Sequence, residues 1–170
     1  MFFQERPKVA LEKSALDYAI EYTTIGLVLF SLVYTIIYYG SLPSDIPMHF
    51  DHKGEMDSYG SKGSIWILNI LSIVTVGGLY YLNRFPHIFN YPQKITEENA
   101  KKHYQEVTLM MRLLNLGVAL LFSILCFEII NIAIGSSLAF HSASNYNILG
   151  IIVAMTVFPL LYVIKNLRSK

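Results

Sequence analysis

Residues 42–62, LPSDIPMHFDHKGEMDSYGSK, hold the densest polar chemistry of the chain and separate two long apolar segments. The stretch contains two prolines, two histidines and four acidic residues. Pro43 and Pro47 each fix one backbone torsion and favour extended geometry in the residue before them, and Gly54 can adopt a positive φ. The stretch therefore predicts a short, stiff hairpin between two helices.

The hairpin should have two different faces, because a strand places alternate side chains on opposite sides. In its first arm, Met48 and Phe50 are expected on one face, and His49 and Asp51 on the other. The hairpin could then lay its apolar face on the helices and present polar groups outward, or the reverse.

The composition indicates an integral membrane protein. Of 170 residues, 54% are hydrophobic and only 15% are charged, and the mean hydropathy is +0.44. The formal net charge is +1, and no basic block is interleaved with aromatic residues, so nucleic acid is excluded as a partner. A lipid bilayer is the expected surrounding.

Four segments approach or exceed the ~20 apolar residues that a helix needs to cross a bilayer. They show no two-residue alternation, and lipid requires internally satisfied backbone groups, so helices are favoured over barrel strands. The expected fold is an all-α membrane protein, a four-transmembrane-helix bundle in a single membrane domain. The expected helices are residues 18–39, 64–82, 109–134 and 148–164.

The distribution of basic residues predicts the orientation. The N-terminal segment 1–17, the loop 83–108 and the C-terminus, together with Arg112 near the start of the third span, carry eleven of the thirteen Lys and Arg residues. The loop 41–63 carries only Lys53 and Lys62. The positive-inside rule therefore places both termini in the cytoplasm and the hairpin outside.

The loop 83–108 should contain its own structure. Thr96 is a suitable N-cap for a short polar helix, although Asn99 stands where a capping box prefers Glu or Gln. This short cytoplasmic helix precedes the third span, and we expect it to continue into that span without a break.

The hairpin carries candidate ligands for a metal or groups for catalysis: His49, Asp51, His52, Glu55 and Asp57. Their spacing matches no established zinc pattern, and no nucleophile motif accompanies them. The three weak candidates for a metal are His49, Asp51 and His52. The simpler interpretation is a turn stabilised by local hydrogen bonds from the aspartates.

Polar residues inside the spans are costly in lipid unless they are paired or face a cavity. Asn69 lies near the outer end of the second span, and Glu128 and Asn131 share one face near the outer end of the third. They could join helices by hydrogen bonds, or they could line a small polar pocket under the hairpin. In the second case Glu128 would accept from a hairpin histidine or from Lys62.

Other residues in the spans suggest structural roles. Glu21 and Arg112 lie close enough to the helix ends to extend towards the interface. Cys126, the single cysteine, is expected to be a small buried side chain. Close helix packing is expected at Ser72, Thr75, Gly77 and Gly78.

The stretch 42–62 follows the pattern L-P-x-x-I-P-x-H-F-x-x-x-G-x-x-D-x-x-G-S-K. This pattern resembles the signature of the domain of unknown function 1648 family, which forms the N-terminal membrane domain of SdpI-like immunity proteins. Asp51 stands where that family commonly has Asn. Residues 89–92 and 96–99 also resemble the second loop of the family.

The resemblance implies a bacterial protein, because SdpI-like proteins protect a bacterial cell from a secreted peptide toxin and signal by sequestering a repressor at the membrane. We therefore expect a multi-pass protein of the bacterial cytoplasmic (inner) membrane, without a cofactor. Its outer loop would recognise a peptide toxin, a lipid or another membrane protein, and it could form a homo-oligomer. The expected binding residues are His49, Phe50, Asp51, Gly54, Asp57, Lys62, Asn69, Glu128 and Asn131.

The alternative hypothesis is a metal-dependent or hydrolytic membrane enzyme. It would use the hairpin cluster of histidines and carboxylates together with Glu128.

Overall fold

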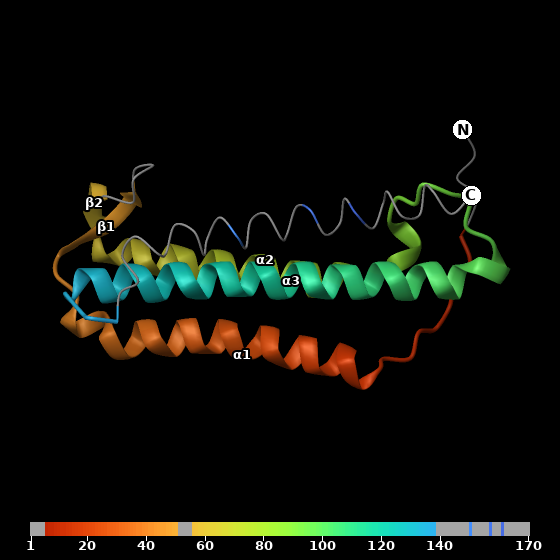
Figure 1. Cartoon of the computed structure of the whole chain (residues 1–170), viewed down its shortest axis with the longest axis horizontal. Helices are drawn as coiled ribbons and strands as arrows, with labels where there is room; N and C mark the ends of the chain where they lie inside the picture. Colours follow the sequence, from red (N-terminus) through yellow and green to blue (C-terminus); the bar gives the residue numbers. More distant parts are fainter. Residues whose placement is uncertain (1–5, 51–55, 139–149, 151–156, 158–160, 162–170) are drawn as a thin grey trace.

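A computed structural model describes residues 6–50, 56–138, 150, 157 and 161 of the chain (Figure 1). Within this part, three helices are long and apolar enough to cross a membrane. They coincide with the first three predicted spans, whereas the predicted fourth span, 148–164, lies almost entirely outside the described residues. The elements are α1 (Ala15–Tyr38), β1 (Asp45–Phe50), β2 (Met56–Ser61), α2 (Ile65–Leu82) and α3 (Glu97–Ala133), with single 3₁₀ turns at Tyr39–Ser41, Lys62–Ser64 and Pro86–Ile88.

The helix α3 is the central element, because both α1 and α2 pack against it. Figure 1 shows α1 and α3 side by side along the long axis, with the two strands at one end and the loop after α2 at the other. At ~1.5 Å per residue the 37 residues of α3 extend about 55 Å, well beyond a hydrocarbon core of about 30 Å. One end of α3 must therefore project from the bilayer.

The projecting end is the polar start of α3, and it is not a separate helix. The short helix predicted before the third span is continuous with it from Glu97 onward. The Thr96 amide donates to Asn99 Oδ1 at 2.9 Å, so Asn99 takes the role for which Glu or Gln was expected. No proline or glycine lies between Glu97 and Leu116, which explains why the helix continues into the apolar region.

The helix α1 is polar towards its neighbours and apolar towards its surroundings. Its buried residues include Thr24, Ser31 and Thr35, whereas Leu29 and Val33 are exposed. A helix in water shows the opposite pattern, but in lipid small hydroxyl residues favour close helix contacts and apolar side chains face outward. The burial pattern therefore supports a membrane location independently of hydropathy.

The segment before α1 is bound to the loop after α2. Arg6 donates to the carbonyl oxygens of His87 and Phe89 and lies over the Tyr91 ring. The buried Tyr104 hydroxyl donates to the Pro7 carbonyl oxygen at 3.0 Å. These contacts hold the start of the chain against the polar end of α3.

Candidate recognition site at the hairpin

The two strands form an irregular antiparallel pair at the place where the sequence predicts a hairpin. The register pairs Ile46 with Gly60 and Pro47 with Tyr59, then skips Met48 on β1. Ile46 and Pro47 are both buried and Met48 is exposed, so the bulge interrupts simple alternation in β1, and the faces expected for His49, Phe50 and Asp51 stay a prediction. Proline has no N–H to donate to the ladder, which explains why the irregularity follows Pro47.

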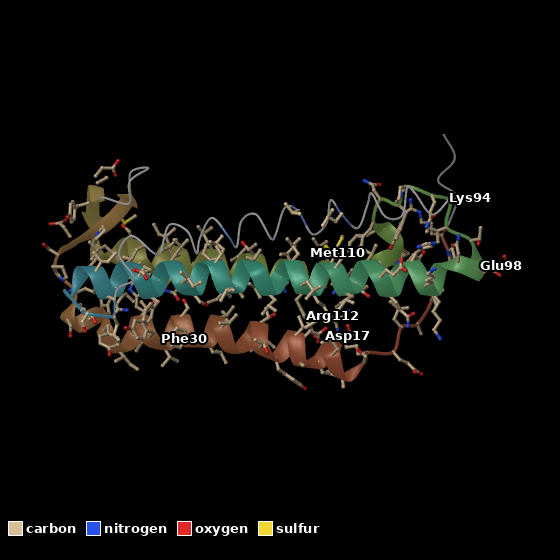
Figure 2. All side chains as sticks on the ribbon, viewed as in Figure 1. Asp17, Phe30, Lys94, Glu98, Met110 and Arg112 are labelled. Carbon is tan, nitrogen blue, oxygen red and sulfur yellow. The ribbon has the colours of Figure 1, made fainter. Side chains whose placement is uncertain are left out.

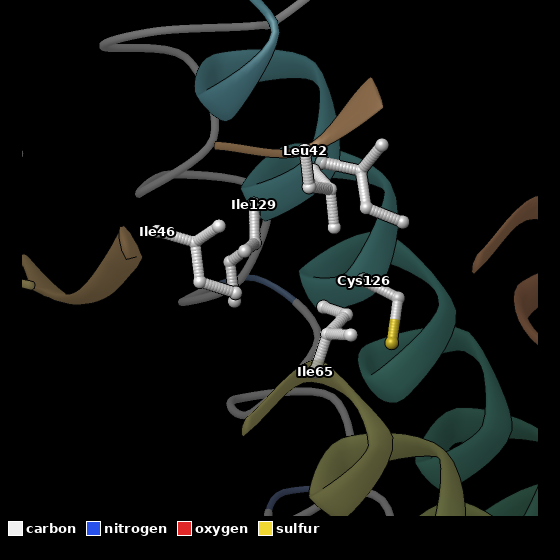
Figure 3. Close-up of a cluster of buried hydrophobic side chains, with 6 residues drawn as sticks. Leu42, Ile46, Ile65, Cys126 and Ile129 are labelled. Carbon is white, nitrogen blue, oxygen red and sulfur yellow. The ribbon is translucent and has the colours of Figure 1, made fainter. Parts of the chain in front are cut away.

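The base of the hairpin is seated in a hydrophobic cluster. Ile46 is 0% exposed and contacts side chains from α2 and α3 (Figure 3). The cluster includes Cys126, which is buried as predicted. Its six buried members are Leu42, Ile46, Ile65, Cys126, Ile129 and Ile130. Since these residues come from the start of the hairpin and from two helices, the cluster fixes the base of the hairpin on the helix ends.

Lys62 closes the base of the hairpin. Its backbone amide donates to the Ser44 carbonyl oxygen at 2.8 Å, and its ammonium lies 3.4 Å from the Leu42 carbonyl oxygen. The ammonium also lies 5.0 Å from the centre of the Tyr39 ring. Lys62 thus joins both ends of the hairpin, a role that differs from the expected partnership with Glu128.

Met48 in β1 and Tyr59 in β2 are both exposed, at 43% and 59%. The Met48 side chain crosses Gly60, where an added Cβ would lie 2.8 Å from Met48 Cγ. Glycine at position 60 therefore leaves room for Met48 to cross the paired strand. The hairpin therefore exposes one apolar and one aromatic side chain on strands whose base is fixed.

Asn69 joins α2 to α1. Its Oδ1 accepts from the Ser31 hydroxyl at 2.9 Å, and its Nδ2 donates to Thr35 Oγ1 at 2.9 Å and to the Ile65 carbonyl oxygen at 3.2 Å. All of these groups are buried, so the amide is satisfied inside the helix contact.

Asn131 joins α3 to α1 at a different place. Its Nδ2 donates to the Tyr34 hydroxyl at 2.9 Å and to the Phe127 carbonyl oxygen at 2.7 Å. Asn69 and Asn131 therefore have separate hydrogen-bond partners, and the predicted polar pocket under the hairpin stays a prediction. Glu128 is 2% exposed, in the part of α3 that packs on β1.

Several predicted site residues lie outside the described part of the chain. They are Asp51, His52, Gly54 and Glu55, together with the side chains of His49 and Phe50. The metal and catalytic hypotheses that depend on them stay predictions. Asp57 is described and belongs to β2.

A charged cluster at the opposite end of the helices was not predicted. Arg112 forms ion pairs with Asp17 at 3.0 Å and with Glu21 at 2.8 Å, and Lys13 contacts Glu21 at 2.6 Å (Figure 2). Burial disfavours the charged form of Lys13, but the hydrogen bond and the charge of Glu21 outweigh it and raise the pKa of Lys13. The spacing of four residues between Asp17 and Glu21, which places both on one helix face, was the available sequence signal.

The fold thus defines a class: helical proteins with membrane-spanning helices and a β-hairpin seated on their ends. Residues 26–73, from the middle of α1 to the middle of α2, match the family model described as "Domain of unknown function (DUF1648)". The match supports the resemblance to this family that the signature predicted, over residues 26–73. The matched segment is centred on the hairpin.

A relative from Archaeoglobus fulgidus, described as an uncharacterized protein, is 29% identical over 103 residues. The alignment covers 50% of this chain and 56% of that protein, so the chain spans little more than half of its relative. No solved structure matches the chain.

Proposed function

We propose that this protein is a non-enzymatic, multi-pass protein of the bacterial cytoplasmic membrane whose hairpin recognises a polypeptide at the outer surface. The chain would form a four-helix bundle with both termini in the cytoplasm, and the recognition would be of the SdpI-like immunity or signalling type. The observation that carries the proposal is the exposed pair Met48 and Tyr59 on a hairpin whose base is fixed in the hydrophobic cluster.

A fixed backbone with exposed side chains favours binding. Tyrosine offers a large contact area at low entropic cost, and methionine adapts to irregular surfaces. Because Lys62 and the hydrophobic cluster already order the hairpin, little further ordering is needed when a partner binds.

The strand arrangement favours a polypeptide as the partner. The strand β1 lies against α3, while β2 forms the other side of the two-stranded sheet. Among the described residues no third strand pairs with β2, and a strand edge of this kind presents backbone donors and acceptors that an extended peptide can pair with. Tyr59 in β2 would contribute side-chain contacts to such a peptide.

The charge distribution supports an outward hairpin. Arg84 at the end of α2 and Lys101 and Lys102 at the start of α3 are exposed at the end opposite the hairpin. Basic residues of this kind are retained on the cytoplasmic side of membranes.

A photo-crosslinker tests the proposal in intact cells. p-Benzoylphenylalanine replaces Tyr59 in one variant and Val74 in the control, since Val74 is equally exposed but lies in the middle of α2. We expect a polypeptide adduct at position 59 that Met48→Ser weakens, and only lipid adducts at position 74. Lipid adducts alone at position 59, or the same polypeptide at both positions, would contradict the proposal.

A further inference from the structure

A pocket lies between α1, α2 and α3, at the end of the helices away from the hairpin. Its volume is about 180 Å³, and its apolar lining includes Ile25, Val76, Leu79 and Met111. An engineered apolar cavity of about 150 Å³ in another protein holds benzene. The pocket is therefore large enough for part of a hydrocarbon chain.

Gly77 helps to form this space. We expected Gly77 and its neighbour Gly78 to be close-packing positions, but an added Cβ at either would meet no atom of the described residues within 4 Å. Gly77 lines the pocket, while Gly78 lies on another side of α2. The absence of a side chain at position 77 keeps the pocket open.

Two buried amide oxygens in the pocket lining lack hydrogen-bond donors. Asn115 Nδ2 donates to the Val76 carbonyl oxygen at 3.1 Å, and Asn83 Nδ2 donates to the Thr108 carbonyl oxygen at 3.0 Å. These bonds fix the orientation of both amides, because only the nitrogen can donate. Both Oδ1 atoms are then buried with no partner among the described residues, and Asn115 is only 6% exposed. Such acceptors call for a donor other than the described residues.

The pocket opens towards the surroundings of the helices. Ile25 and Tyr80 line it and are also exposed on the outer surface, where a bilayer supplies hydrocarbon. At the polar end, Lys13 binds Glu21 and lies 5.5 Å from the centre of the Tyr80 ring. The site therefore changes from charged at the helix ends to apolar inside, which suits an amphiphile.

We infer that this pocket binds a membrane lipid whose acyl chain enters between α1 and α2 and whose head carries hydroxyl donors. A hydroxyl group of the head donates to the orphaned oxygen of Asn83 or of Asn115, and the chain contacts Ile25 and Val76. Water would satisfy the two oxygens but would gain nothing from the apolar walls. A lipid provides both a hydroxyl donor for an amide oxygen and a hydrocarbon chain for the apolar walls. The site is independent of the hairpin and of the function proposed for it.

Three lipids with a photoreactive diazirine in the acyl chain test this inference. Phosphatidylglycerol and diacylglycerol carry hydroxyl groups, and phosphatidylcholine carries none. The full-length protein is purified in mild detergent, incubated with each lipid and irradiated, and the modified residues are mapped by mass spectrometry. We expect labelling of the pocket residues of α1, α2 and α3 by a hydroxyl-bearing lipid, and at least about tenfold less by phosphatidylcholine.

Matched variants distinguish labelling by a lipid in the pocket from labelling by lipid that merely contacts the helix surface. Gly77→Leu should reduce pocket labelling by about tenfold, and Gly78→Leu, which adds the same side chain outside the pocket, should not change it. Ile25→Trp fills the pocket from α1 and serves as a second blocking variant if Gly77→Leu does not fold. Labelling by both hydroxyl-bearing lipids, or by one alone, supports the inference and shows whether the phosphate contributes.

Equal labelling by phosphatidylcholine would overturn the role of the hydroxyl group. Unchanged labelling in the blocking variants, or no labelling in the pocket, would overturn the site itself.

Discussion

Individual polar residues in this protein are satisfied across helix contacts, which lipid makes necessary. Asn69 uses both of its amide atoms on α1 and on its own helix, and Asn131 does the same with Tyr34 and Phe127. An unpaired amide in a bilayer core has no water to bond with. Each asparagine therefore fixes the rotation of a helix as well as its distance from α1.

Asn69→Leu should lower the free energy of unfolding by about 1–2 kcal/mol. The substitution removes the bonds to Ser31 and Thr35 and leaves the Ser31 hydroxyl without its acceptor. Unfolding in mixed detergent micelles measures the change, with the lipid-facing Val74→Leu as the control. An unfolding curve identical to that of the wild type would show that these bonds do not stabilise the helix contact.

Gly60→Ala should lower the free energy of unfolding by about 1 kcal/mol, because the new Cβ meets Met48 Cγ. Combining it with Met48→Ala removes that carbon and should restore most of the loss. Gly63→Ala is the matched control, since its Cβ would have only an ordinary contact of 3.7 Å with Ser61 Oγ. The same thermal unfolding temperature for the single and the double variant would mean that the contact with Met48 is not the cause.

At the scale of the elements, two different kinds of contact hold α1 to α3. Near the hairpin, α1 and α3 share the Tyr34–Asn131 bond and stacked aromatic rings, including Phe30 and Phe127. At the other end, the ion pairs of Arg112 in α3 with Asp17 and Glu21 in α1 join the two helices. Between α1 and α2 the polar contact is concentrated at Asn69, and the pocket occupies the space further along.

Arg112→Leu should lower the free energy of unfolding by about 2–3 kcal/mol, because two partly buried carboxylates lose their shared cation. Neutralising these carboxylates as well, with Asp17→Asn and Glu21→Gln, should recover part of the loss. Denaturation in mixed micelles at neutral pH compares the single and triple variants. A triple variant less stable than Arg112→Leu alone would contradict a role for uncompensated charge.

At the scale of the whole molecule, the sequence predicts what depends on local pattern. Apolar length predicted the three described helices, and two prolines with a glycine predicted an antiparallel pair between α1 and α2. The bulge at Met48 was missed because it depends on the contact with Gly60 across the strands.

Features that depend on which faces of the helices meet could not be predicted from the sequence either. The separate partners of Asn69 and Asn131 follow from which faces of α2 and α3 meet α1. The ion pair of Arg112 with Glu21 joins residues 91 positions apart, and the lining of the pocket comes from all three helices. None of these leaves a periodic signal in the chain.

The recognition proposal depends on the side of the membrane that the hairpin faces. Tyr59→Cys and Lys101→Cys place single exposed thiols at opposite ends of the molecule, and the native Cys126 is buried and gives little background. A membrane-impermeant maleimide is added to intact cells and, separately, to permeabilised cells. The account predicts that Cys at position 59 reacts in intact cells and that Cys at position 101 reacts only after permeabilisation. The reverse result would place the hairpin in the cytoplasm and contradict the account.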